Sequence, residues 1–190
     1  MPITSNTPAS SGGAVVAYSI IPPLPTGLIL NPTTGVISGT PTVVTPAASY
    51  TITATNRAGF TTAALTLTVV SAYTAWAGQN GLVQGPQGDD DGDGNSNYFE
   101  FIAGLDPTNA TSAFSVRIAP VAGQPNQTAI TFSPVVIGRT YTVKRSDSLP
   151  PGSWTPLSGS TASDVGNQRT VIDTGAAGVK GFYFVEISYP

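Results

Sequence analysis

The sequence lacks cysteine and histidine entirely, and only 9% of its 190 residues are charged. Disulfides, zinc sites built on thiolate or imidazole, and His-based acid–base catalysis are therefore excluded. The net charge is −3 and the seven basic residues are scattered, so the chain offers no basic surface for nucleic acid. It also has no apolar run of membrane-spanning length, and we expect no membrane insertion.

What is abundant favours β-structure. A chain so poor in Glu, Lys and Arg has little material for amphipathic helices, yet an apolar content of 40% is too high for disorder. Its 21 glycines and 17 prolines divide the apolar stretches into short segments rich in Val, Ile and Thr. This composition predicts an all-β protein.

Residues 1–70 form a first domain of short strands. The expected strands are residues 14–20, 28–30, 35–39, 49–56 and 61–70, with a tight hairpin connection at residues 31–34. Tyr50, Ile52 and Ala54 alternate with polar residues, and this period of two is typical of a sandwich strand with one face in solvent.

Three motifs in this region follow one another in a recognisable order. They are Leu24-Pro-Thr-Gly-Leu28, Thr34-Gly-Val-Ile-Ser-Gly-Thr-Pro41 and Tyr50-Thr-Ile-Thr-Ala-Thr-Asn56. Together they resemble the immunoglobulin-like (Ig-like) repeats of bacterial surface proteins, which are related to the cadherin-like domains of dystroglycan-type proteins. The resemblance implies an Ig-like β-sandwich that serves as a spacer or adhesion module.

Such repeats carry one more strand before the segment that corresponds to residues 4–8. We expect the resulting open edge to be completed in one of three ways. A neighbouring domain of a longer chain could supply the strand, or another copy could donate residues 1–10 or 182–190 and build a filament. Alternatively, the domain's own N-terminal residues fill the edge.

Residues 71–107 form a predicted linker that carries the concentrated chemistry. Five of the ten acidic residues fall within positions 89–100, and no basic residue lies between Arg57 and Arg117. Counted from Asp89, the segment matches the calcium-loop pattern D-x-D-x-D-G-x5-E at every ligand position. Ca²⁺ takes about six to eight oxygen ligands, which alternate residues of a tight loop can supply. We therefore predict one Ca²⁺ bound by Asp89, Asp91, Asp93, the backbone carbonyl of Asn95, Asn97 and Glu100.

A short helix is expected on each side of this loop. Ser71 is a candidate cap for a helix that ends at Asn80-Gly81, and Tyr98, Phe101, Ile102 and Leu105 form an apolar stripe on an exit helix that Gly104 stops. The loop resembles those of dockerins and thrombospondin type-3 repeats. Because a lone loop without a paired hand makes a poor sensor, we expect a structural role for the metal. The alternative is a solvated acidic turn in which Glu100 only caps the helix.

Residues 108–190 return to strands, expected at 114–118, 128–132, 139–145, 170–173 and 181–188. The region resembles the small β-sandwich that ends many secreted bacterial proteins. Trp154 and Tyr141 are candidates for a sugar-stacking platform, but a core position for Tyr141 and an edge-covering role for Trp154 fit the burial habits of aromatics better.

The whole chain is thus predicted to hold two β-sandwich domains joined by a calcium-loop linker. No phosphate loop, nucleophile elbow or Ser–His arrangement is present, so we expect no enzyme and assign no catalytic residue. The favoured interpretation is a non-catalytic structural or adhesive protein of the bacterial surface or exterior, with other copies of itself, neighbouring domains or surface glycans as partners. The alternative is a carbohydrate-binding accessory module of a secreted hydrolase.

Overall fold

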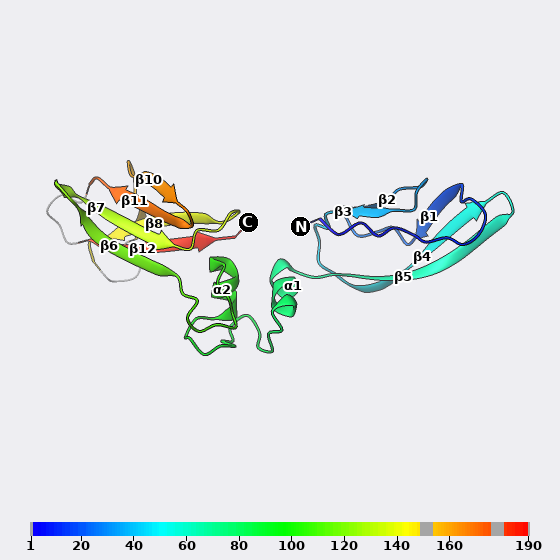
Figure 1. The fold of residues 1–190 in the computed structure, drawn as a ribbon, viewed down its shortest axis with the longest axis horizontal. Coiled ribbons are helices and arrows are strands. Elements are labelled where there is room, and N and C mark those ends of the chain that lie inside the picture. The colour runs from blue at the N-terminus through cyan, green and yellow to red at the C-terminus, as the bar shows by residue number, and fades with distance from the viewer. Residues whose placement is uncertain (1, 149–153, 176–180, 190) are drawn as a thin grey trace. The chain divides into compact units, whose positions relative to one another are not determined.

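The computed structural model describes residues 2–148, 154–175 and 181–189, and its regular secondary structure is mostly strand (Figure 1). The described residues contain twelve strands and two short helices, so the protein is all-β as predicted. They divide into two compact units, residues 1–75 and 76–190. The boundary lies inside the first helix, and the acidic segment groups with the second unit, whereas the sequence suggested a separate linker over 71–107.

The first unit contains two sheets. The larger has the order β1-β4-β5 and the smaller pairs β2 with β3, all antiparallel. These strands are β1 (Ala17–Ile21), β2 (Leu28–Leu30), β3 (Ile37–Gly39), β4 (Thr45–Asn56) and β5 (Gly59–Val69). The expected hairpin at residues 31–34 is present, because Leu30 pairs with Ile37 across it. Tyr50, on the predicted apolar face of β4, is buried together with Leu28 and Ile37.

Residues 3–6 lie along the free side of β3. The amide of Ile3 donates to the carbonyl of Gly39 at 2.9 Å, and Asn6 and Ile37 exchange two backbone hydrogen bonds of 3.0 Å. This edge of the smaller sheet is therefore covered by the domain's own N-terminal residues, which is the third of the arrangements that the sequence left open.

The second unit contains a β-sandwich. One sheet has the order β10-β11-β7-β6 and the other β12-β8-β9. The strands are β6 (Ser115–Val121), β7 (Gln124–Ser133), β8 (Thr140–Ser146), β9 (Thr155–Pro156), β10 (Thr161–Val165), β11 (Gln168–Asp173) and β12 (Phe182–Ser188). Ile130, Phe132 and Val171 from the first sheet pack with Val143 from the second to form the buried core.

All five strands expected in this unit are present, but β9 and β10 were not expected. Strand β10 is exposed along its whole length and carries no apolar alternation, so a pattern of burial could not reveal it.

The two helices, α1 (Ala72–Gln79) and α2 (Asn97–Ala103), occupy the predicted places. Ser71 caps α1, because its Oγ accepts the backbone N–H of Thr74 at 3.0 Å. Neither helix is long and apolar enough to cross a membrane, and this statement covers the described residues only.

Candidate metal centre

The acidic loop lies between the two helices and leads directly into α2. Ser96 is the N-cap of α2 and accepts the backbone N–H of Phe99 at 3.2 Å. At the other end Gly104 adopts a left-handed conformation with φ 72° and donates to the carbonyl of Glu100 at 2.7 Å. Both ends of the exit helix are thus capped, the C-terminal end by the glycine that the sequence predicted and the N-terminal end by Ser96, which it did not single out. The helix holds Glu100 at a defined position after the loop.

The carboxylates of Asp89, Asp91 and Asp93 converge. Each contributes an oxygen, and these oxygens lie within 4.8 Å of one another. We call these three residues the aspartate triplet. Alternate residues point to one centre because the loop bends sharply at Gly94, whose φ is 93°, a conformation that glycine adopts without strain. The predicted pattern therefore brings three of its side-chain ligands together.

Asp89 organises the backbone of the loop. Its Oδ1 accepts the N–H of Gly92 at 2.7 Å and that of Asp93 at 3.2 Å, and its Oδ2 accepts the N–H of Gly94 at 2.9 Å. The bond from Gly94 makes the largest contribution to lowering the pKa of Asp89 below its ordinary value. Asp89 is thus held ionised by the loop that it supports.

Three carboxylate oxygens of the site are buried without a hydrogen-bond partner among the described residues. They are Oδ2 of Asp91 and both side-chain oxygens of Glu100, whose residue is 0% exposed. Burial, and then the charges of Asp91, Asp93 and Asp89, raise the pKa of Glu100 to about 7. Burial likewise raises the pKa of Asp91. Buried oxygens that only accept, with no donor to meet them, fit a cation.

Glu100 does not belong to the set of oxygens that lie within 4.8 Å of one another. The charges of all three aspartates nevertheless raise the pKa of Glu100, so its carboxyl group is close enough to the aspartate triplet to feel its negative charge. Its place on the first turn of α2 makes the helix part of the site.

Asn97, predicted at the ninth loop position, uses both ends of its amide within the protein. Its Oδ1 accepts the backbone N–H of Asp90 at 3.1 Å, and its Nδ2 donates to the carbonyl oxygens of Gly85 at 3.2 Å and Gln84 at 3.4 Å and to the Asp90 carboxylate. Asn97 is 0% exposed. These bonds fasten the segment before the loop to the start of α2.

Asp90 is the residue of this site that the sequence reasoning did not single out. Its carboxylate accepts the backbone N–H groups of Val83 at 3.1 Å and Gln84 at 3.3 Å as well as the amide of Asn97. Burial opposes its ionisation, but the bonds from Val83, Asn97 and Gln84 outweigh it, and the pKa of Asp90 is lowered. The available signal was that Asp90 is acidic although its position in the calcium pattern has no ligand role, which indicates another function for its carboxylate.

The side chain of Asn95 bonds to Asp93. Its Nδ2 donates to Oδ2 of Asp93 at 2.9 Å, and its backbone N–H donates to Oδ1 at 2.6 Å. These bonds use the side chain and the backbone N–H of Asn95, and not its backbone carbonyl, which is the predicted Ca²⁺ ligand.

The exit helix is anchored to the sandwich of the second unit. Arg139, in the β7–β8 connection, donates from Nε to the carbonyl of Ile102 at 2.8 Å and from Nη2 to that of Phe101 at 2.9 Å. Its guanidinium also lies 4.0 Å from the centroid of the Tyr189 ring, which in turn packs on Phe101 at 5.0 Å. An interaction that fixes Glu100 would therefore also stabilise a helix that is bonded to the sandwich.

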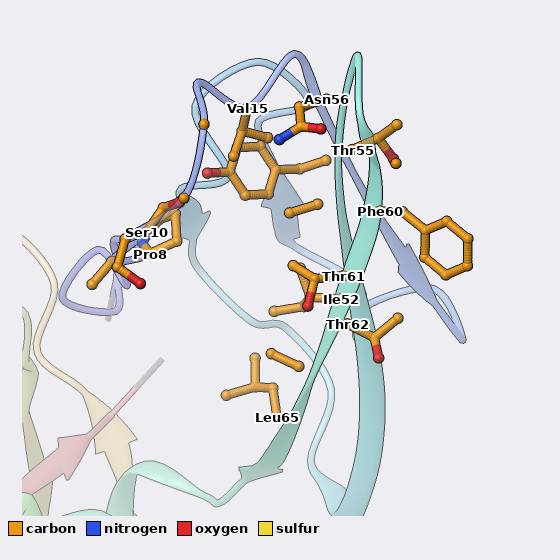
Figure 2. A pocket seen from close by; sticks show the side chains of 18 of the residues that line it. Pro8, Ser10, Val15, Ile52, Thr55, Asn56, Phe60, Thr61, Thr62 and Leu65 are labelled. Atoms are coloured by element: carbon orange, nitrogen blue, oxygen red, sulfur yellow. The ribbon is translucent and has the colours of Figure 1, made fainter.

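A second feature lies in the first unit. An open groove of about 850 Å³ runs between the segment of residues 6–13 and the hairpin of β4 and β5. Figure 2 shows Pro8 and Ser10 on the N-terminal segment, and Ile52 and Leu65 on the hairpin across from them. No charged residue lines the groove.

Comparison with known families concerns the N-terminal part of the chain. Residues 1–72 match the model of a family described as "Putative Ig domain". The N-terminal unit is an Ig-like domain. No curated protein matches the chain, and no solved structure does.

The Ig-like domain does not contain the aspartate triplet, because the family match ends at residue 72, before the acidic loop begins. The calcium pattern and its resemblance to dockerin-type loops therefore remain predictions that rest on the loop's own residues. The groove, by contrast, lies wholly within the Ig-like domain.

The two aromatic residues proposed as a sugar platform have different surroundings. Tyr141 packs in the core with Phe132 at 5.5 Å, and its hydroxyl accepts the N–H of Val136 at 2.8 Å. Trp154 lies 5.9 Å from Phe184 instead. Tyr141 is thus the core strand residue that the alternative interpretation described.

Proposed function

We propose that this protein is a non-catalytic, extracellular structural or adhesive protein in which an Ig-like domain is followed by a calcium-stabilised β-sandwich. The Ca²⁺ would be held by the aspartate triplet and Glu100. When bound, the ion would supply positive charge to the buried oxygens of Asp91 and Glu100 and to the neighbouring carboxylates of Asp89 and Asp93.

The observation that carries this proposal is the set of buried, unpartnered oxygens on Asp91 and Glu100. An ionised carboxylate buried without a donor is strongly destabilising, and four acidic side chains in one loop repel one another. Evolution would be expected to remove such a group unless something compensates for it. A bound cation compensates for all of these oxygens at once.

The chemistry of the donor set favours calcium. All of the side chains are hard oxygen donors, and the irregular cage of a bent loop suits the flexible coordination of Ca²⁺ better than the strict octahedron that Mg²⁺ demands. The chain has no Cys or His to attract softer metals.

The role of the ion would be structural. Glu100 stands on α2, and Arg139 joins the last turn of α2 to the sandwich. A cation that draws Glu100 toward the aspartate triplet would therefore stabilise the helix and, through it, the whole second unit. The affinity expected for such an extracellular site is about 10⁻⁵ to 10⁻³ M.

Titration calorimetry tests the proposal. We expect one Ca²⁺ per chain, with Mg²⁺ far weaker, and no binding in Asp91→Ala or Glu100→Ala. Asp147→Asn is the matched control, because Asp147 is an acid outside the loop whose side chain is 68% exposed. Binding that survives in both loop variants, or no heat at millimolar Ca²⁺ in the wild type, would disprove the metal site.

A further inference from the structure

The free edge of β5 is an unpaired row of backbone groups. In the sheet order β1-β4-β5 this eleven-residue strand pairs only with β4. None of the backbone hydrogen bonds found outside the helices and ladders of the described residues involves β5. Its outward N–H and C=O groups are thus a template for another strand.

The hairpin register shows which residues present these groups. A two-residue loop, Arg57-Ala58, joins Asn56 to Gly59, and such a turn closes with a bond between its first and fourth residues. Bonded and non-bonded pairs alternate from there in an antiparallel ladder, so residues 61, 63 and 65 bond to β4. Residues 60, 62, 64 and 66 therefore turn their N–H and C=O groups to the free edge. The register is regular over 59–67, since the irregularity in this hairpin lies opposite residues 67–69.

The edge of β5 also carries none of the features by which proteins keep strand edges apart. It contains no charged residue and no proline. The other edge strands among the described residues are protected. Charged residues or prolines interrupt four of them: Arg117 and Pro120 in β6, Asp164 in β10, Glu186 in β12 and Pro156 in β9. Strand β2 is only three residues long. Strand β1 has five residues, and the N–H of Tyr18 is bonded to the carbonyl of Pro32.

The side chains of β5 are exposed as well. Residues 59–64 are all exposed, and Phe60 reaches 76%. Figure 2 shows the Phe60 ring pointing away from the groove while Leu65 lies beside it. The side chains on both faces of residues 59–64, mainly threonine and alanine, therefore leave room for a neighbouring strand beside β5.

We propose that β5 pairs with β5 of a second copy of this chain. The edge is uncharged, so two identical edges meet without repulsion, and an antiparallel pair of identical strands is self-complementary about a two-fold axis. The result is a continuous six-stranded sheet, β1-β4-β5 followed by β5-β4-β1 of the second copy. Such a dimer is closed, unlike the head-to-tail filament considered from the sequence.

The register of this pair follows from the outward-facing residues. The arrangement that uses the whole regular stretch 59–67 places Ala63 on the two-fold axis, with Phe60 opposite Thr66 and Thr62 opposite Ala64 of the second copy. Ala63 then faces its own counterpart in a non-hydrogen-bonded pair, in which Cα atoms lie about 4.5 Å apart.

Sedimentation of the full chain over a range of concentrations tests the pairing. Ala64→Pro removes one outward N–H from each copy without touching the ladder to β4, and should raise the dimer dissociation constant about tenfold or more. Ala64→Val keeps the N–H and the strand preference, and should leave the constant within about threefold. A wild type that stays monomeric up to millimolar concentration, or a dimer that Ala64→Pro does not weaken, would overturn the proposal.

A cross-link provides a second readout that does not depend on the proline variant folding. The chain has no cysteine, so Ala63→Cys should form an intermolecular disulfide in mild oxidant, because disulfides span Cα distances of about 4.4–6.8 Å. Ala162→Cys, an exposed alanine on the edge strand β10, is the control and should stay monomeric. Equal cross-linking of both variants would refute the β5 pairing. Chelator should change neither result, so these outcomes are independent of the metal proposal.

Discussion

Removing calcium should destabilise the second unit and leave the Ig-like domain unchanged. The buried oxygens of Glu100 and Asp91 have no partner among the described residues, and Glu100 lies on the helix that Arg139 anchors to the sandwich. Chelation would therefore withdraw support from α2 and from the strands that it contacts. The first unit contains none of these residues.

The magnitude follows from linkage. At a Ca²⁺ concentration of one hundred times Kd, binding to the folded state alone adds about 2.7 kcal/mol to the free energy of unfolding. For a unit of this size, 1 kcal/mol corresponds to about 4 °C, so chelator should lower its melting temperature by about 10 °C.

Differential scanning calorimetry with and without chelator measures this shift. Phe132→Ala identifies the transition of the second unit, because Phe132 is 1% exposed in its core and the substitution should cost about 3–5 kcal/mol there. Calcium should raise the temperature of the transition that Phe132→Ala lowers, and should leave the transition of the Ig-like domain unchanged.

Glu100→Gln gives the sharpest control, since its effect should change sign with the metal. Burial raises the pKa of Glu100 to about 7, so at pH 8, above this value and above that of an exposed glutamate, ionisation of Glu100 destabilises the metal-free folded state relative to the unfolded state. Replacing it by glutamine should raise the melting temperature in chelator and remove the calcium-dependent shift. A shift that persists in Glu100→Gln, or equal shifts of both transitions, would refute the reasoning.

Three further outcomes are expected. Asn97→Asp loses the amide that donates to the Asp90 carboxylate, so calorimetry should show Ca²⁺ binding weakened at least tenfold; tighter binding would make residue 97 a ligand. Arg139→Lys keeps the charge but loses the paired bonds to α2, and should lower the unfolding free energy in urea by about 1–3 kcal/mol, which an unchanged midpoint would contradict. Gly104→Ala puts a Cβ 2.5 Å from Val136 at a positive φ and should cost about 1–3 kcal/mol in the same assay, whereas a neutral effect would mean that this contact relaxes freely.

The sequence predicted the β-structure well wherever burial imposes a pattern. Tyr50 lies on a strand whose alternate residues meet the interior, and the alternation alone indicated it. Strand β10 has no buried residue, so its pairing with β11 depends on contacts that leave no mark in its own composition. The pairing of residues 3–6 with β3 was only one of three alternatives for a similar reason, because a few backbone bonds require no particular side chains.

In the acidic loop the sequence predicted that Asp89, Asp91 and Asp93 converge, because their alternate spacing brings them together, whereas Glu100, predicted with them, lies outside that set. It could not predict the hydrogen bonds of Asn97, since an amide at that position can reach an ion or other groups of the protein. The choice depends on where residues 84 and 85 run, and their path is set by Asp90. Arg139 gave no signal either, because its contacts with α2 join residues far apart in the chain.

The stacking of Tyr189 on Arg139 and Phe101 has a consequence for the order of folding. The acidic loop is local, so its turns can form as soon as residues 89–100 are free to fold. Tyr189 can stack on the helix that follows them only after β12 has paired and brought Tyr189 into place, with nearly the whole unit lying between the contacting residues in the chain. Contacts of such long sequence separation form slowly. During refolding the ion would therefore meet a formed loop well before the helix behind it is seated, and calcium uptake should precede the final rise in tertiary signal.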